Sequence, residues 1–240
     1  MIALSRAVPA VLAPVMLVVA SQAATPRAGR AQVVTVDEGS FTVSRGGARL
    51  GREEFRILRQ PSGATSAYVA RATGVYGDRR ITPALQTDAE GTPERYQVEV
   101  RRSGAVEQQV SAQAAGTHFR AQTRTDAGEA AREYLIEPGT LVIDDELYHQ
   151  YYFLVRRAAG GNGARVSVLA PRRSAQSVVT VTLDGTERVS VGGRPVEARH
   201  YVLTDGAAGR REVWADAQGR VLRVVLPAEG IEAVRDDVPR

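Results

Sequence analysis

Glycine-containing turn signals divide most of this chain into short segments in which apolar and polar residues alternate. Gly46-Gly47 separates two such segments near the N-terminal end, and Ser103-Gly104 separates two more. Asp184-Gly185 and Gly192-Gly193 do the same toward the C-terminal end. Alternating segments with turn signals about every 8–12 residues are typical of antiparallel strands joined in sequence order. The pattern predicts a mainly β fold, an antiparallel meander that forms a curved sheet or an open barrel.

One segment, "DDELYHQYYFLVRR" at residues 144–157, has a helical pattern instead. Its acidic residues come first and its two arginines come last, which suits the helix dipole, and Asp144 is the expected N-cap. Tyr148, Tyr151 and Tyr152 lie in two adjacent apolar stripes with helical spacing. The sequence therefore predicts one central amphipathic helix at about 144–157, packed across the sheet.

The N-terminal end has the pattern of a secretory signal peptide. An apolar run, Ala7 to Ala20, follows Arg6 and leads into small residues, so we expect cleavage after Ala23. The alternative is a membrane anchor, but the run is shorter than the roughly 20 residues that a spanning helix needs and contains two prolines. We expect a signal peptide at 1–23, a flexible lead-in at 24–32, a single β-rich domain at 33–236, and no stable membrane span after cleavage.

Two features of the composition limit the chemistry of such a protein. The chain has no cysteine, which excludes disulfides, thiolate catalysis and the lipid-bearing cysteine of a lipoprotein. The formal net charge is +4, and every Lys-or-Arg position is arginine. These arginines alternate with acidic residues along the chain, whereas a nucleic-acid binder clusters its basic residues. We expect a periplasmic or secreted protein with no nucleic-acid partner.

Sequence motifs favour neither catalysis nor metal binding. The chain has no G-x-S-x-G motif for a nucleophilic serine. Asp145 and His149 would share a helix face, but a metal site needs further ligands, and nothing in the sequence places His118 or His200 beside them. The glycine-rich stretch at 160–165 follows the helical pattern instead of preceding it, as a phosphate-binding loop would. We predict no catalytic residue, no metal site and no cofactor.

A binding or structural role remains. Several of the few aromatic residues gather on the predicted helix. An open curved sheet closed by that helix would make a concave apolar surface, which suits a lipid or another amphiphile. We predict that Tyr148, Tyr151, Tyr152 and Trp214 form the ligand site, with arginines at its rim. The alternative is that these aromatic side chains simply fill the core.

The stretches "YLIEPGTLVIDDELYHQYYFLVRR" and "RREVWADAQGRVLRVVLPAEGIEAVR" resemble an uncharacterised family of secreted bacterial β-rich envelope proteins, a domain of unknown function. The resemblance covers roughly 134–235. It implies an antiparallel β fold in the periplasm or cell envelope and brings no established catalytic residues. The layout is also loosely similar to that of periplasmic lipoprotein carriers, whose half-open barrels hold acyl chains. The matching positions are Pro138, Gly139, Tyr151, Tyr152, Leu154, Trp214, Asp216 and Val225.

We therefore expect an exported, non-enzymatic envelope protein that binds or carries an apolar or amphiphilic ligand, or that supports envelope assembly. Its partners would be a lipid or other apolar ligand and an envelope protein. One alternative is an envelope-polymer hydrolase, which convergence of His149 with further acidic or histidine residues in a cleft would favour. The other is a purely structural module for protein–protein interaction, which an exposed apolar patch would favour.

Overall fold

The computed structural model describes residues 32–62, 65–159, 163–206 and 209–240. The predicted signal peptide lies outside these residues, as does the predicted lead-in except for its last residue. The chain divides by its contacts into two units, Met1–Arg30 and Ala31–Arg240, and the fold described below is that of the second unit.

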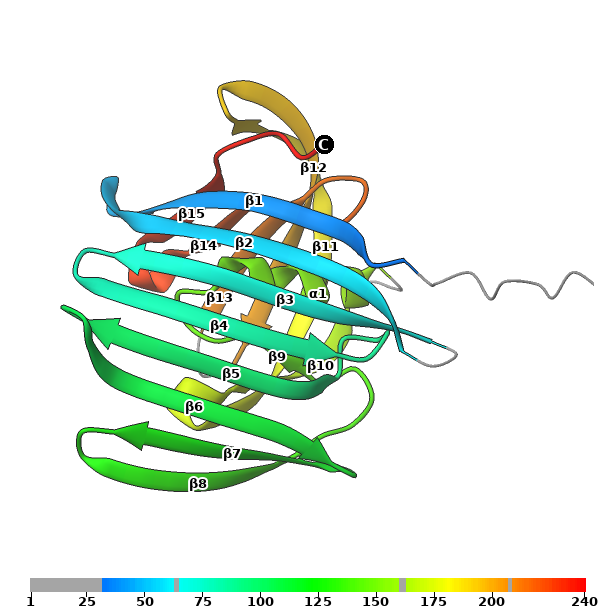
Figure 1. Cartoon of the computed structure of the whole chain (residues 1–240). Helices are drawn as coiled ribbons and strands as arrows, with labels where there is room; N and C mark the ends of the chain where they lie inside the picture. The colour runs from blue at the N-terminus through cyan, green and yellow to red at the C-terminus, as the bar shows by residue number, and fades with distance from the viewer. Residues whose placement is uncertain (1–31, 63–64, 160–162, 207–208) are drawn as a thin grey trace, which may run out of the picture. The chain divides into compact units, whose positions relative to one another are not determined.

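The strands of this unit form one sheet, which confirms the predicted mainly β fold (Figure 1). Its first eight strands are a meander in which each strand pairs with the next. All of these pairs are antiparallel. The strands are β1 (Val34–Arg45), β2 (Ala48–Ser62), β3 (Thr65–Tyr76), β4 (Arg79–Thr87), β5 (Pro93–Arg102), β6 (Ala105–Ala115), β7 (His118–Thr125) and β8 (Gly128–Leu135).

The second half of the chain extends the same sheet from the other side of β1. The last strand, β15, pairs with β1, and the strands follow in reverse order to β9 at the far edge. Only β9 and β10 pair in parallel in the described sheet. The elements are β9 (Leu141–Val142), β10 (Ala164–Ala170), η2 (Pro171–Arg173), β11 (Ala175–Val191), β12 (Arg194–Asp205), β13 (Gly209–Ala215), β14 (Val221–Leu226), η3 (Pro227–Glu229) and β15 (Ile231–Arg235).

The predicted helix is present, but it begins at Tyr148 instead of Asp144. A 3₁₀ turn, η1 (Tyr148–Gln150), runs directly into α1 (Tyr151–Ala158). The expected cap at Asp144 is wrong, because a strand supplies the cap. The carboxylate of Glu53 on β2 accepts the backbone N–H of Tyr148 at 2.7 Å and that of His149 at 3.3 Å. Free N–H groups at a helix start need such an acceptor.

The helix lies between the two halves of the sheet. On one side the ring of Tyr148 lies 6.4 Å from that of Phe41 on β1, and Phe153 meets Tyr68 of β3 edge-on at 5.9 Å. On the other side α1 contacts β10, β11, β13 and β14. Figure 1 shows α1 behind β2 and β3 and close to β11. The main core therefore consists of helix side chains enclosed by the inner face of one curled sheet. No helix in the described part of the chain has both the length and the apolar character needed to cross a membrane.

The predicted turn at Asp184-Gly185 is wrong. The strand β11 continues through it and pairs with β12 on both sides, with a register shift between Leu183 and Gly185. Gly185 has a φ of 155°, which residues with a side chain rarely adopt. A β-bulge uses such a residue to absorb an extra position in a strand. The turns at Gly46-Gly47, Ser103-Gly104 and Gly192-Gly193 are confirmed.

Candidate functional site

The four aromatic residues predicted to form one ligand site lie in two separate clusters. Tyr148, Tyr151 and Tyr152 belong to the main core around the helix. Trp214 packs with Leu222 and its neighbours in a smaller cluster. Each of the four side chains is at most 4% exposed. The structure therefore brings the three tyrosines together and leaves Trp214 apart from them.

Trp214 and Tyr152 are held by protein partners. The Trp214 ring stacks on that of His200 with centroids 4.4 Å apart, and its indole N–H donates to the Glu187 carboxylate. The guanidinium of Arg223 lies 4.7 Å from the centre of the indole. The ring of Tyr152 meets Phe153 edge-on at 5.4 Å. Because of these contacts, the side chains of Trp214 and Tyr152 are part of the packed protein interior.

Tyr148 and Tyr151 line a cavity of about 320 Å³, which we call the rim pocket. It lies where η1 begins, beside the ends of β1 and β14 and the start of β4. Leu147, Leu226 and Ile231 give it an apolar wall. Its charged lining consists of Arg45, Arg79, Arg172, Arg211, Asp144, Asp145, Glu146 and Glu229.

The two phenols of the rim pocket differ in their partners. Burial raises the pKa of Tyr148 and of Tyr151, so both remain neutral near pH 7. Arg211 Nη1 lies 3.4 Å from the Tyr151 hydroxyl. Within the described ranges no group hydrogen-bonds to the Tyr148 hydroxyl, although its backbone N–H is bound by Glu53. A neutral phenol can both donate and accept, so this hydroxyl is available to a ligand.

Glu146 lines the rim pocket in an uncommon backbone conformation. Its φ is +63°, in the left-handed region. Its carboxylate lies 2.9 Å from Arg79 Nη1 and 3.4 Å from Arg172 Nη2, and its carbonyl accepts the Tyr76 hydroxyl at 2.7 Å. These contacts hold a conformation that is otherwise unfavourable, and backbone strain of this kind concentrates at functional sites.

Asp144 forms part of the pocket wall and is 3% exposed. Burial raises its pKa to about 6, although the charge of Arg172 and a hydrogen bond from Tyr96 act in the opposite direction. The Tyr96 hydroxyl donates to Oδ2 at 2.8 Å, and the Arg172 backbone N–H donates to Oδ1 at 3.2 Å. This carboxyl group therefore titrates close to neutral pH.

His149 does not join Asp145 in a metal pair. Its Nδ1 lies 2.6 Å from Oε1 of Glu53, and its side chain is fully buried, whereas the Asp145 carboxylate lies 2.9 Å from Arg173 Nε. In the part of the chain that the structure describes, no three His, Cys, Asp or Glu residues are placed to hold a metal ion. Glu53 was not among the residues predicted for the site, although strand alternation puts it on the same face as the buried Phe55.

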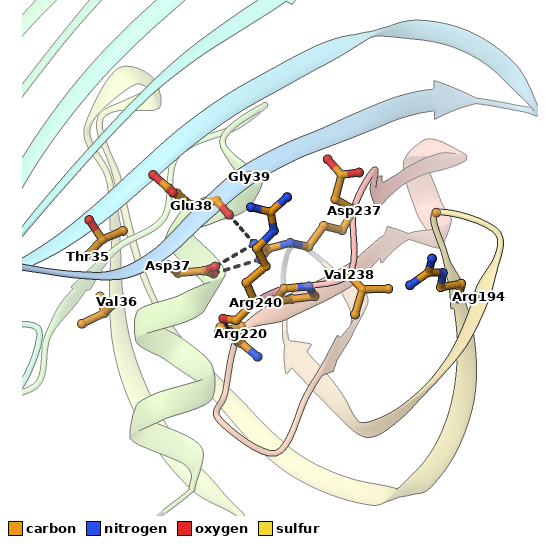
Figure 2. Close-up of a pocket in the computed structure, with 13 residues that line it drawn as sticks. Thr35, Val36, Asp37, Glu38, Gly39, Arg194, Arg220, Asp237, Val238 and Arg240 are labelled. Carbon is orange, nitrogen blue, oxygen red and sulfur yellow. Dashed lines mark hydrogen bonds and ion pairs between the residues drawn. The ribbon is translucent and has the colours of Figure 1, made fainter.

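A larger cavity of about 840 Å³, the arginine cavity, lies at the N-terminal half of β1 (Figure 2). Sequence patterns cannot reveal it, because its walls come from segments far apart in the chain. Its lining residues are Thr35, Val36, Asp37, Glu38, Gly39, Gly192, Arg194, Arg220, Arg235, Asp237, Val238, Pro239 and Arg240.

Comparisons with known proteins point to families described only by fold or sequence. Residues 163–235 match a family described as a domain of unknown function, DUF6134. In fold the chain is similar to a solved beta-barrel-like protein of DUF1849 from Brucella abortus, with 11% identity, a TM-score of 0.52, and coverage of 84% of this chain and 94% of that chain. A DUF1089 family protein from Pseudomonas aeruginosa has 14% identity, a TM-score of 0.42, and coverage of 71% and 87%.

A search of the curated proteins finds no match. The match to DUF6134 spans β10 to β15 and stops short of the first half of the sheet. This chain is thus similar in sequence, over that part, to a domain of unknown function, and similar in fold to a barrel-like protein.

Proposed function

We propose that this chain is an exported, non-enzymatic protein of the cell envelope that binds the polar head of an amphiphilic ligand in the rim pocket. The observation that carries the proposal is the placement of Tyr148 and Tyr151 in a cavity bordered by arginines. Its volume of about 320 Å³ is within the range of small-molecule sites. The signal-peptide pattern of the sequence supports the proposed export.

Two arginines of the pocket are suited to an anionic head group. Arg45 is exposed and has no ion-pair or hydrogen-bond partner for its side chain among the described residues. Arg211 is half-buried, and its guanidinium is directed toward the Tyr151 hydroxyl. A guanidinium presents a planar fork of N–H donors that matches a carboxylate or phosphate. Arg79 and Arg172 instead hold Glu146, so they shape the pocket.

The apolar part of the ligand would contact the pocket wall and not the interior of the sheet. Tyr152, Phe153 and Leu154 occupy that interior and are each at most 4% exposed. The wall offers Leu147, Leu226 and Ile231 together with the tyrosine rings. This arrangement supports recognition of a compact head group with the adjoining part of its chain, in place of a ligand that contacts all four predicted aromatic residues.

The proposal is tested by native mass spectrometry of the protein purified from its own envelope, followed by calorimetric titration with lysophosphatidylglycerol below its critical micelle concentration. We expect a bound amphiphile, and a dissociation constant at least tenfold higher for the double variant Arg45→Gln, Tyr148→Phe. Arg49→Gln is the matched control, because it also removes one positive charge but lies on the neighbouring strand, outside the pocket. This variant should bind as the unaltered protein does. Bare protein from the envelope, with no difference between these variants, would contradict the proposal.

A second candidate function is hydrolysis of an envelope polymer, and Asp144 favours it. A carboxyl group with a pKa of about 6 can act as a general acid near neutral pH. Release of soluble fragments from purified peptidoglycan, abolished by Asp144→Asn and kept by Asp145→Asn, would support hydrolysis. Absence of release by the unaltered protein would leave the binding role as the better account.

A further inference from the structure

The arginine cavity has the features of a second ligand site that is independent of the rim pocket. No residue lines both cavities. We propose that the arginine cavity binds an organic anion, in which a carboxylate or phosphate group is attached to an apolar body. A buried arginine, the charges around it and the apolar residues beside it support this proposal.

Arg235 is the buried anchor of this cavity and is 2% exposed. Its Nη1 and Nη2 donate to the Asp37 carboxylate at 3.0 and 2.8 Å, and Nη2 also donates to the Glu38 carbonyl. The ring of Phe55 lies 5.2 Å from the guanidinium carbon. Its Nε is buried and has no hydrogen-bond partner in the described structure. Such a buried donor without a partner is rare in folded proteins.

Gly39 leaves the space that this guanidinium occupies. A Cβ at this position would lie 2.8 Å from Arg235 Nη2 and 3.2 Å from Nε. The guanidinium cannot move away freely, because Asp37 and Glu38 hold it. The position of the Arg235 guanidinium at the end of β15 therefore requires a glycine at position 39 of β1.

The acidic residues nearest the anchor are already paired. Asp37 is bound by Arg235, and Glu38 Oε2 lies 2.8 Å from Arg56 Nε. Asp37 is 5% exposed, and this burial raises its pKa in spite of the arginine beside it. Asp237, which is exposed, is the remaining acidic residue of the lining.

The other arginines of the cavity are placed to receive an anion. Arg220 is oriented by Asp216, whose Oδ2 lies 2.7 Å from its Nε, and its Nη1 donates to the Arg240 carbonyl. Arg194, the first residue of β12, has no side-chain partner among the residues described. Figure 2 shows Arg194 on the side of the cavity opposite Asp37 and Glu38. An anion between these walls would meet guanidinium groups from separate elements, which favours a carboxylate or phosphate.

Apolar residues beside these arginines indicate that the anion carries an apolar body. Val36 packs against the main core, and Val238 packs against the cluster that contains Trp214. Pro239 adds a third apolar surface to the lining. A free inorganic ion would leave the part of their apolar surface that lines the cavity of about 840 Å³ uncovered.

Calorimetric titration with four probes tests the inference: decanoate, decyl phosphate, decanol and inorganic phosphate, each below its aggregation threshold. We expect decanoate or decyl phosphate to bind at least tenfold more tightly than decanol and inorganic phosphate. The better of the two anions identifies the head group. The emission of Trp214, the one tryptophan of the chain, should change on binding because Val238 packs against its cluster.

Matched variants assign the binding to this cavity. Arg194→Gln should raise the dissociation constant at least tenfold. Arg199→Gln removes the same charge from an exposed position on the same strand, outside the lining, and should leave binding unchanged. Equal binding by the two arginine variants, equal binding of decanol, or no binding of either decanoate or decyl phosphate would overturn the inference.

Discussion

The role that the local sequence predicts for Asp144 differs from its role in the folded protein. From its neighbours in the chain it is the expected cap of a helix, because it precedes an amphipathic run. In the structure its carboxyl group is buried among Tyr96, Gln150 and Arg172, and it accepts hydrogen bonds from two of them. Its own backbone N–H donates to Oε1 of Gln150 at 2.7 Å. The burial that produces its high pKa comes from strands that lie far from it in the sequence.

The raised pKa of Asp144 predicts a stability that falls as pH rises. Below about pH 4 the carboxyl group is protonated in both the folded and the unfolded chain. As pH rises from about 4 through about 6, the unfolded chain loses this proton first, so the unfolded state is stabilised relative to the folded one. The free energy of unfolding should therefore decrease by on the order of 3 kcal/mol. This figure is the difference between the folded and unfolded pKa values multiplied by ~1.4 kcal/mol per pKa unit.

Asp144→Asn removes this titration while keeping the shape of the side chain. Urea unfolding between pH 4.5 and pH 7.5 should show the variant gaining ~2–3 kcal/mol relative to the unaltered protein as pH rises. Asp145→Asn is the matched control, because the Asp145 side chain is 45% exposed. A difference between Asp144→Asn and the unaltered protein that stays constant with pH would contradict the prediction.

At the scale of elements, the helix depends on a residue of β2. Neither η1 nor α1 has a side-chain cap at its own N-terminal residue. Glu53 replaces that cap and also binds Nδ1 of His149, with no exposed surface of its own. Strand alternation beside Phe55 shows from the sequence that Glu53 faces inward, but only the fold shows what it meets there.

Glu53→Ala should destabilise the protein strongly. The change leaves His149 and two backbone N–H groups without their acceptor in a buried site, and breaking such a buried pair costs ~3–5 kcal/mol. Glu54→Ala is the control, because the Glu54 side chain is 67% exposed, and it should change the free energy of unfolding by less than ~0.5 kcal/mol. Urea unfolding at pH 7 measures both, and equal effects would refute a capping role for Glu53.

Strand boundaries were predictable from the sequence where a turn signal is compatible only with a reversal of the chain. Gly46-Gly47 and Gly192-Gly193 reverse the chain, since both glycines of each pair have positive φ, as a tight hairpin requires. Asp184-Gly185 carries the same kind of signal, but the alternation on its two sides allows one long strand with a bulge. Pairing with β12 decides between these outcomes, and that pairing is not visible in a local window.

At the scale of the whole molecule, the two halves of the chain are joined by the pairing of β1 with β15. Phe41–Arg45 pairs with Ile231–Arg235, and the order of strands runs outward from this ladder to β8 and β9. Asp37 and Arg235 add a buried ion pair beside it. The segments come from the beginning and the end of the described chain, so loop closure must precede these contacts.

Deletion of residues 231–240 should therefore abolish cooperative folding. Without β15 the backbone groups of β1 and β14 along the ladder have no partner, and open strand edges promote association. Deletion of Asp237–Arg240 alone keeps β15 and should leave a cooperative transition. Size-exclusion chromatography and urea unfolding followed by circular dichroism compare the two. A monomer that unfolds cooperatively after the longer deletion would show that the ladder is dispensable.

The sequence by itself determined the properties that depend on near neighbours: β-rich class, most hairpin turns, the helical segment and its apolar faces. Alternation, glycine dipeptides and helical spacing act within a few residues, so they can be read locally. Tertiary structure decided which groups meet: Glu53 at the helix start, Trp214 away from the tyrosines, and the residues that line the two cavities. Burial, pKa and cavity shape depend on contacts between strands distant in the chain, and those contacts form only when the sheet curls around its helix.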